Sequence, residues 1–221
     1  MGREKNKKII IKPNLILCEG EDTTQFIIIY LEYLQKREKY FESFMAFDFG
    51  GNDELPVFLS DIQTYTGFDI AASITIIRDS EDNHSRAVQS IKSALTKSGF
   101  PVPQGPNKIA RNDKIKAAFA LFPSLSQTNR NGTLEDLYIE NLVEDGAEYL
   151  LNNINYFLDE LKSKGRVFNW FHKTRLYTYF SVTDKFVSKK IGQATEAGAF
   201  DFECAEMNSL KELLRNIAED F

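Results

Sequence analysis

The sequence predicts an α/β protein with a four-stranded, mainly parallel sheet, flanked by helices and followed by a helical C-terminal half. Up to Gly132, short apolar segments bounded by turn residues alternate with segments that repeat apolar residues at helical spacing. Such alternation is typical of right-handed βαβ crossovers, which build parallel sheets. From Leu134 onward the pattern is mainly helical. These two patterns together predict the fold class.

The expected strands are short and apolar. Asn14–Cys18 is nearly all apolar, as expected of a strand covered on both faces, and Pro13 separates it from a shorter β segment at Ile9–Ile11. The other expected strands are Phe44–Phe49, which Gly50 closes, Ile70–Ile77, which Asp79 follows, and Lys116–Phe122, which Pro123 ends.

The expected helices follow from apolar spacing and from boundary residues. In the first part of the chain they begin at Thr23 or Thr24, span Leu55 to Ile62, and span Ser85–Ser98, which Gly99 ends. In the second part they are Leu134–Leu142, Ala147–Lys164, Lys173–Lys190 and Ser209–Ala218. We therefore expect an α/β core over residues 1–142 and a helical extension over residues 143–221, packed on the core as one structural unit.

Composition narrows the class of protein. The 221 residues are 43% hydrophobic and 27% charged, which is typical of a globular chain rather than a disordered one. Two cysteines, Cys18 and Cys204, cannot form a disulfide framework, so we expect a cytoplasmic location. Residues 1–8 lack the apolar core of a signal peptide, and no apolar run reaches membrane-spanning length. We therefore expect no membrane partner.

Acidic segments follow three of the expected strands. They are Glu19 to Asp22, Asp79 to Asn83, and Gly132 to Leu137. Ligands of open α/β sheets bind outside the carboxyl ends of the strands, so these segments are expected along one edge. Clustered carboxylates repel one another, and a hard cation relieves that repulsion. Because only two histidines occur and the cysteines have no paired spacing, zinc is not expected. The sequence predicts a Mg²⁺ site, with Mn²⁺ as the alternative ion.

The order of these motifs resembles the TOPRIM domain, which topoisomerases, primases and OLD-family nucleases share. Glu19-Gly20-Glu21-Asp22 matches a strand ending in Glu-Gly-x-Asp, and Asp79-Ser80-Glu81-Asp82 matches an Asp-x-Asp-like motif with Glu for the later Asp. Three further segments resemble uncharacterised bacterial TOPRIM-like proteins related to OLD nucleases: Gly132–Leu137, Lys189–Ala194 and Gly198–Phe202.

The resemblance implies roles for particular carboxylates. It makes Glu19 a metal ligand or general acid/base and Asp79 a metal-binding catalytic residue. Glu81 and Asp82 would contribute to the same metal site, although the longer arm of Glu81 alters the ligand geometry. Glu135 and Asp136 would complete a second metal site.

Each motif also has a structural interpretation. Glu19-Gly20 is compatible with an ordinary βα turn, and Asp79 to Asn83 with a solvated turn that caps the third helix. Thr133 and Asp136 can form a variant of the capping box at a helix start. These interpretations remain open at the level of sequence.

A basic and aromatic segment contrasts with the acidic chain, whose net charge is −5. Residues 162–190 carry a net charge of +7, from eight basic residues and one acidic residue, with seven aromatic residues interleaved. The segment can bind nucleic acid, with Lys185, Lys189 and Lys190 on phosphates and aromatics on bases. Alternatively, the aromatics belong to the core and the charges form their solvated face.

Three functions compete at the level of sequence. The first is Mg²⁺-dependent phosphodiester chemistry on nucleic acid, as a nuclease or phosphotransferase. The second is a non-catalytic TOPRIM-like module that binds nucleotide or nucleic acid, or acts as a partner subunit or homodimer. The third is a receiver-type domain with Asp79 as phosphoacceptor, ranked last because the chain is long and the late strand lacks a following basic residue.

Overall fold

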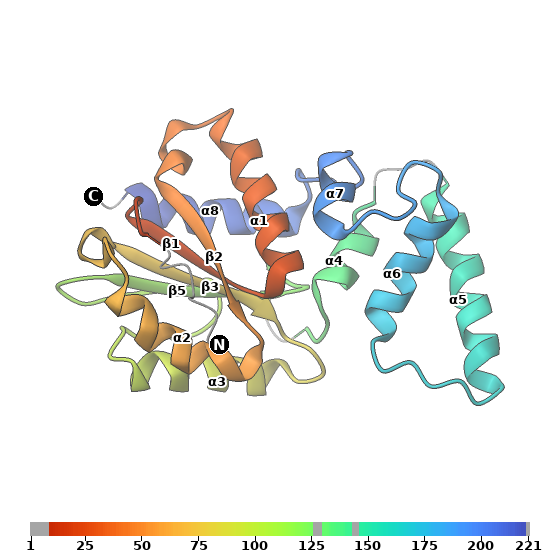
Figure 1. Ribbon diagram of the computed structural model, residues 1–221, viewed down its shortest axis with the longest axis horizontal. Helices are drawn as coiled ribbons and strands as arrows, with labels where there is room; N and C mark the ends of the chain where they lie inside the picture. Colours follow the sequence, from red (N-terminus) through yellow and green to blue (C-terminus); the bar gives the residue numbers. More distant parts are fainter. Residues whose placement is uncertain (1–8, 126–129, 143–145, 220–221) are drawn as a thin grey trace, which may run out of the picture.

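A five-stranded sheet forms the centre of the protein. The computed structural model describes residues 9–125, 130–142 and 146–219 (Figure 1). The strands are β1 (Asn14–Glu19), β2 (Phe44–Gly50), β3 (Ser73–Asp79), β4 (Ile109–Arg111) and β5 (Lys116–Phe122). Their order is β2-β1-β3-β5-β4; the first four are parallel, and β4 is antiparallel to β5. The expectation of an α/β fold with a mainly parallel sheet is confirmed.

The expected strand number was wrong by one. The additional strand, β4, pairs Ile109 with Ala118 at the edge of the sheet. Three residues are too few to show an alternating pattern, so sequence periodicity could not identify this strand. The segment Ile9–Ile11 forms no strand, although the Ile10 N–H donates to the Thr66 carbonyl over 2.9 Å.

Two hydrophobic layers cover the sheet. Helices α2 (Leu55–Asp61) and α3 (His84–Lys97) lie on one face, and α1 (Gly20–Gln35) and α8 (Ala205–Glu219) lie on the other (Figure 1). Successive strand residues point to opposite faces, so Leu15 and Leu17 join the core under α2 and α3, whereas Ile16 and Cys18 join the core under α1. Both faces are covered, as the apolar strands predict.

The remaining helices lie beyond the carboxyl ends of the parallel strands (Figure 1). They are α4 (Leu134–Glu140), α5 (Ala147–Ser163), α6 (Phe171–Val182) and α7 (Ile191–Glu196). Helices α5 and α6 pack against each other and form an arm, and α4 packs on α6. Buried residues of α4 to α8 belong to the same hydrophobic core as α1. The expected division between residues 142 and 143 falls beside residues 143–145, which lie outside the described residues, as do residues 1–8.

Helix boundaries differ from the expected ones most in residues 173–190, and α1 and α8 begin three to four residues earlier than expected. Helix α6 ends at Val182 rather than at Lys190, since the backbone becomes extended at the C-cap residue Thr183, with φ −112° and ψ 121°. Turns follow, and then the short helix α7, which was not expected. None of the helices in the described residues is both long and apolar enough to cross a membrane.

Candidate metal centre

Two acidic side chains meet where neighbouring strands end. Glu19 is the last residue of β1 and Asp79 the last residue of β3, and the two strands are adjacent in the sheet. The Asp79 N–H donates to the Glu19 Oε2 over 3.3 Å. The expected adjacency of these two strand ends is therefore present, and it follows from the parallel pairing of β1 with β3.

A glycine turn sets the position of Glu19. Gly20 has a φ of +77° and begins α1 directly after the strand. A Cβ at this position would meet nothing within 4 Å, so the left-handed backbone rather than close packing favours glycine. The turn lets α1 begin directly after β1, without an intervening loop. Glu19 therefore lies at the carboxyl edge of the sheet, just before the N-terminus of α1.

The third acidic segment approaches Asp79 through α4. The Leu134 N–H, in the first turn of α4, donates to the Asp79 Oδ1 over 2.9 Å. Glu135, the next residue, is only 3% exposed. Glu81 and Gly132 exchange two backbone hydrogen bonds of 2.8 and 2.7 Å, which fix the two acidic loops to each other. Segments separated by more than 50 residues are thus held at one site.

These carboxylates line one cavity of about 560 Å³, here called the acidic cavity. Its described acidic lining consists of Glu19, Glu21, Asp22, Asp79, Glu81 and Glu135. The described lining includes neither histidine nor cysteine. Oxygen donors of this kind suit Mg²⁺ or Mn²⁺ rather than zinc.

The electrostatics of the acidic cavity disfavour full ionisation of its carboxylates. Burial raises the pKa of Asp79 well above its ordinary value, and the carboxylates of Glu135 and Glu19 raise it further. Burial also raises the pKa of Glu19, whereas the nearby Arg78 guanidinium lowers it. A bound cation would favour the ionised forms, because it offsets both burial and mutual repulsion.

Two lysines stand at the rim of the acidic cavity. The Lys173 Nζ lies 3.6 Å from the Asp22 Oδ2 and 3.7 Å from the Glu135 Oε1, and the Lys190 Nζ lies 3.7 Å from the Glu21 Oε2. Their side chains are 52% and 67% exposed, so solvent weakens these pairs to at most about 1 kcal/mol each. The lysines can therefore exchange a carboxylate for a phosphate at small cost.

Two aromatic residues of the arm also line the acidic cavity. Trp170 is 73% exposed and lines both this cavity and a neighbouring one of about 500 Å³. Burial, followed by the nearby Asp22 carboxylate, raises the pKa of Tyr177 to about 12. Tyr177 therefore remains a neutral hydrogen-bond donor at neutral pH.

Asp136 and Asp82 occupy different positions from the other predicted ligands. Asp136 accepts the Thr133 N–H over 2.9 Å, completes a capping box, and lies 2.8 Å from the His172 Nδ1. The capping box expected for Asp136 and Thr133 is therefore present. Asp82 is exposed and lines the two neighbouring cavities but not the acidic cavity.

Of the three lysines predicted to bind nucleic acid, only Lys190 lines the acidic cavity. Lys185 is exposed and lies over the Phe186 ring at 5.2 Å, and Lys189 is half-buried in the turns before α7. Phe180 and Phe186 are buried, as the core interpretation of this segment predicts, whereas Trp170 is exposed. The core interpretation is therefore confirmed for Phe180 and Phe186, and the nucleic-acid interpretation stays a prediction.

Three residues at the site were not singled out as site residues from the sequence: Arg78, Lys173 and Trp170. Arg78 directly follows the expected strand Ile70–Ile77, and a charged residue at the end of an apolar strand requires a partner when it is buried. Lys173 and Trp170 belong to the basic and aromatic segment, but their position depends on the docking of the arm, which no sequence pattern predicts.

The carboxylates of the acidic cavity have the chemistry that a divalent cation requires, but their side chains are not arranged around a common point. Within the described residues, no group of three or more His, Cys, Asp or Glu side chains is arranged so that it could hold a metal ion. The oxygen-only acidic lining and the raised pKa of Asp79 nevertheless favour a hard cation. Glu19, Asp79 and Glu135 are the residues that would hold it.

The fold and the site define an α/β protein with an acidic cavity at the carboxyl edge of a mainly parallel sheet. A family model described as "Protein of unknown function (DUF3226)" matches residues 13–219, and the chain belongs to this family. No curated protein and no solved structure matches the chain. The family description names no activity, so the chemistry must be inferred from the residues themselves.

Proposed function

We propose that the protein performs Mg²⁺-dependent phosphodiester chemistry on nucleic acid, as a nuclease of TOPRIM-like type. The observation that carries this proposal is the convergence of Glu19, Asp79 and Glu135, from three acidic segments, on one cavity at the carboxyl edge of the sheet. Bound there, Mg²⁺ or Mn²⁺ would polarise a phosphodiester and generate a hydroxide nucleophile near neutral pH.

The chain's own residues would bind and orient the substrate. Lys173 and Lys190 at the rim attract the phosphate backbone, which the carboxylates alone would repel. Trp170, exposed at the mouth, offers a face on which a base can stack. Burial raises the pKa of Glu19, so this carboxyl can hold a proton during the reaction. These features favour nucleic acid over a simple phosphate ester.

A specific observation also supports a second function, a non-catalytic module that binds nucleotide or nucleic acid or serves as a partner subunit. Lys173 already lies between Asp22 and Glu135, where it neutralises part of the acidic charge. A cavity neutralised by its own lysine can bind a phosphate without a metal ion. The two functions differ in whether a bond is cleaved.

Thermal unfolding with Mg²⁺ and cleavage of labelled oligonucleotides test the proposal together. A ligand that binds only the folded state at about 100 times its Kd stabilises that state by about 2.7 kcal/mol, and this increment should vanish in Asp79→Asn. The matched control is Asp69→Asn, an exposed carboxylate just before the opposite end of β3.

The outcomes separate the two functions. Metal-dependent cleavage that Asp79→Asn abolishes supports the nuclease. Binding of oligonucleotides without cleavage supports the non-catalytic module. Equal stabilisation of the wild type, Asp79→Asn and Asp69→Asn by Mg²⁺ would show that Asp79 is not a metal ligand.

A further inference from the structure

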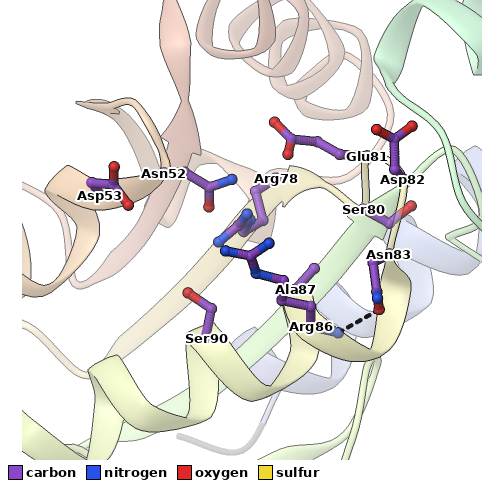
Figure 2. Close-up of a pocket in the computed structure, with 10 residues that line it drawn as sticks. All are labelled: Asn52, Asp53, Arg78, Ser80, Glu81, Asp82, Asn83, Arg86, Ala87 and Ser90. Atoms are coloured by element: carbon purple, nitrogen blue, oxygen red, sulfur yellow. Dashed lines mark hydrogen bonds between the residues drawn. The ribbon is translucent and has the colours of Figure 1, made fainter.

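A second cavity, here called the arginine pocket, lies on the other side of the β3 strand end. Its volume is about 430 Å³, and its lining comes from the turn between β2 and α2, from the end of β3 and from the first turns of α3 (Figure 2). Asn52 and Glu81 line both this pocket and the acidic cavity. The two cavities are therefore neighbours at one edge of the sheet.

Arg78 supplies a buried positive charge to the arginine pocket. It precedes Asp79 in β3, so its side chain points to the face that carries α2 and α3. The side chain is 3% exposed, and its Nε lies 3.5 Å from the Glu19 Oε2. Its Nη1 is buried and has no hydrogen-bond partner among the described residues. A buried guanidinium donor without an acceptor is unfavourable, and an anion in the pocket would supply one.

Arg86 brings a second guanidinium to the same place. It lies in the first turn of α3, where its backbone N–H donates to the Asn83 Oδ1 over 2.9 Å. Its exposed side chain has no hydrogen-bond or ion-pair partner among the described residues, and in Figure 2 it points toward the same part of the pocket as Arg78. Two guanidinium groups that converge repel each other, and the N-terminus of α3 adds further positive potential. The local field therefore favours an anion.

Three carboxylates, those of Asp53, Glu81 and Asp82, also line the arginine pocket. All three residues are exposed, and Figure 2 shows the carboxylate of Asp82 directed away from the two arginines. Solvent and salt screen exposed charges far more strongly than the buried charge of Arg78. The buried guanidinium of Arg78 thus determines the sign of the charge that the ligand of this pocket carries.

We propose that the arginine pocket binds a phosphate group of a nucleic-acid strand, next to the phosphate that occupies the acidic cavity. Arg78 and Arg86 are the phosphate-binding residues, since the planar guanidinium matches phosphate oxygens and donates two parallel hydrogen bonds. Arg78, paired with Glu19, links the two cavities. The strand as the source of the phosphate rests on the proposed function, whereas the phosphate site does not.

Titration with inorganic phosphate in EDTA tests the pocket without metal or cleavage. Phosphate should raise the thermal midpoint of the wild type more than that of Arg86→Gln. The control Arg111→Gln replaces an exposed arginine on β4 and should behave as the wild type. The general stabilisation that phosphate gives all proteins is common to the three, so only their difference counts. Equal responses of wild type and Arg86→Gln would overturn the site.

Oligonucleotide binding in EDTA identifies the source of the phosphate. By fluorescence anisotropy, Arg86→Gln should weaken the binding of a single-stranded oligonucleotide about tenfold, as expected when one charge-assisted hydrogen bond is removed. If Arg86→Gln weakens binding of a nucleoside monophosphate but not of the oligonucleotide, the strand assignment is wrong. If the wild type and Arg111→Gln cleave nothing with Mg²⁺ while the Arg86-dependent binding persists, the nuclease proposal fails and the phosphate site stands.

Discussion

The acidic cavity and the arginine pocket lie side by side but bury charges of opposite sign. In the acidic cavity the carboxylate of Glu135 is buried, and the two lysines at the rim, Lys173 and Lys190, are exposed. In the arginine pocket Arg78 is buried, and the carboxylates are exposed. Because buried charges are screened least, we expect the first cavity to favour a cation and the second an anion. An edge that offers both is suited to a phosphate with its metal ion.

The largest expected effect comes from breaking the link between the two cavities. Arg78→Met leaves the nearly buried Glu19 carboxylate without its partner, which should lower the free energy of unfolding by about 3 kcal/mol at pH 8. Urea unfolding measures the decrease. The double variant Glu19→Gln with Arg78→Met should recover part of it. An unchanged stability of Arg78→Met would show that the pair contributes nothing.

A smaller effect of opposite sign is expected within the acidic cavity. Asp79→Asn removes one of the clustered charges but keeps an oxygen that can accept the Leu134 N–H. Without metal at pH 7.5, its thermal midpoint should rise by about 2–4 °C, as for a gain of about 1 kcal/mol in a chain of this size.

The matched control for Asp79→Asn is Asp136→Asn, which weakens the capping box of α4. It should lower the midpoint by a similar amount, because a cap contributes about 1 kcal/mol. If Asp79→Asn lowers the midpoint as Asp136→Asn does, the carboxylates of the acidic cavity do not repel one another.

The pH dependence of stability tests the same repulsion. Since the folded state raises the pKa of Asp79, it binds a proton more tightly than the unfolded chain does. This contribution to stability is complete below the ordinary carboxyl pKa and is lost as pH rises through the raised pKa. The metal-free midpoint should therefore rise when pH is lowered from 8 toward that window. Saturating Mg²⁺ should flatten this slope, as should Asp79→Asn; a slope unchanged in Asp79→Asn would contradict the assignment.

The smallest expected effect concerns the exposed lysines. In the triple variant Lys185→Ala, Lys189→Ala and Lys190→Ala, the logarithmic salt slope of single-strand binding should flatten by about 0.7 for each phosphate that the protein no longer neutralises. We expect most of the change from Lys190, which alone of the three lines the acidic cavity. Anisotropy at several salt concentrations measures it. If Lys185→Ala alone gave the full effect, the nucleic-acid strand would bind near Lys185 rather than at the acidic cavity.

Sequence patterns predicted the elements better than the site. The strand Lys116–Phe122 was predicted with the same bounds that it has in the structure, because a buried apolar run ended by proline has few alternatives. Glu135 and Asp136, in contrast, are adjacent acidic residues in the same helical turn, and both were predicted to be metal ligands, although Asp136 was also a capping candidate. Only the docking of α4 buries Glu135 in the acidic cavity and turns Asp136 toward Thr133 and His172.

The role of Arg78 also depended on tertiary structure. Its place in β3 indicates which face it occupies, but its partner belongs to a strand that lies about 60 residues earlier in the chain. Sheet order determines that pairing, and sheet order is set by the packing of the whole core. The arginine pocket could not be predicted for the same reason, since it requires the turn after β2 to stand beside α3.

The hydrogen bond from the Leu134 N–H to the Asp79 carboxylate connects the edge of the sheet to α4 and, through α4, to the helical arm. A ligand that binds the Oδ1 atom of Asp79 competes with its hydrogen bond to the first turn of α4, and α4 packs against α6 of the arm. Such coupling works in both directions, because two binding events that share an element change each other's affinity by the same factor. A macromolecule that binds the arm would therefore change the affinity of the acidic cavity for its ligand.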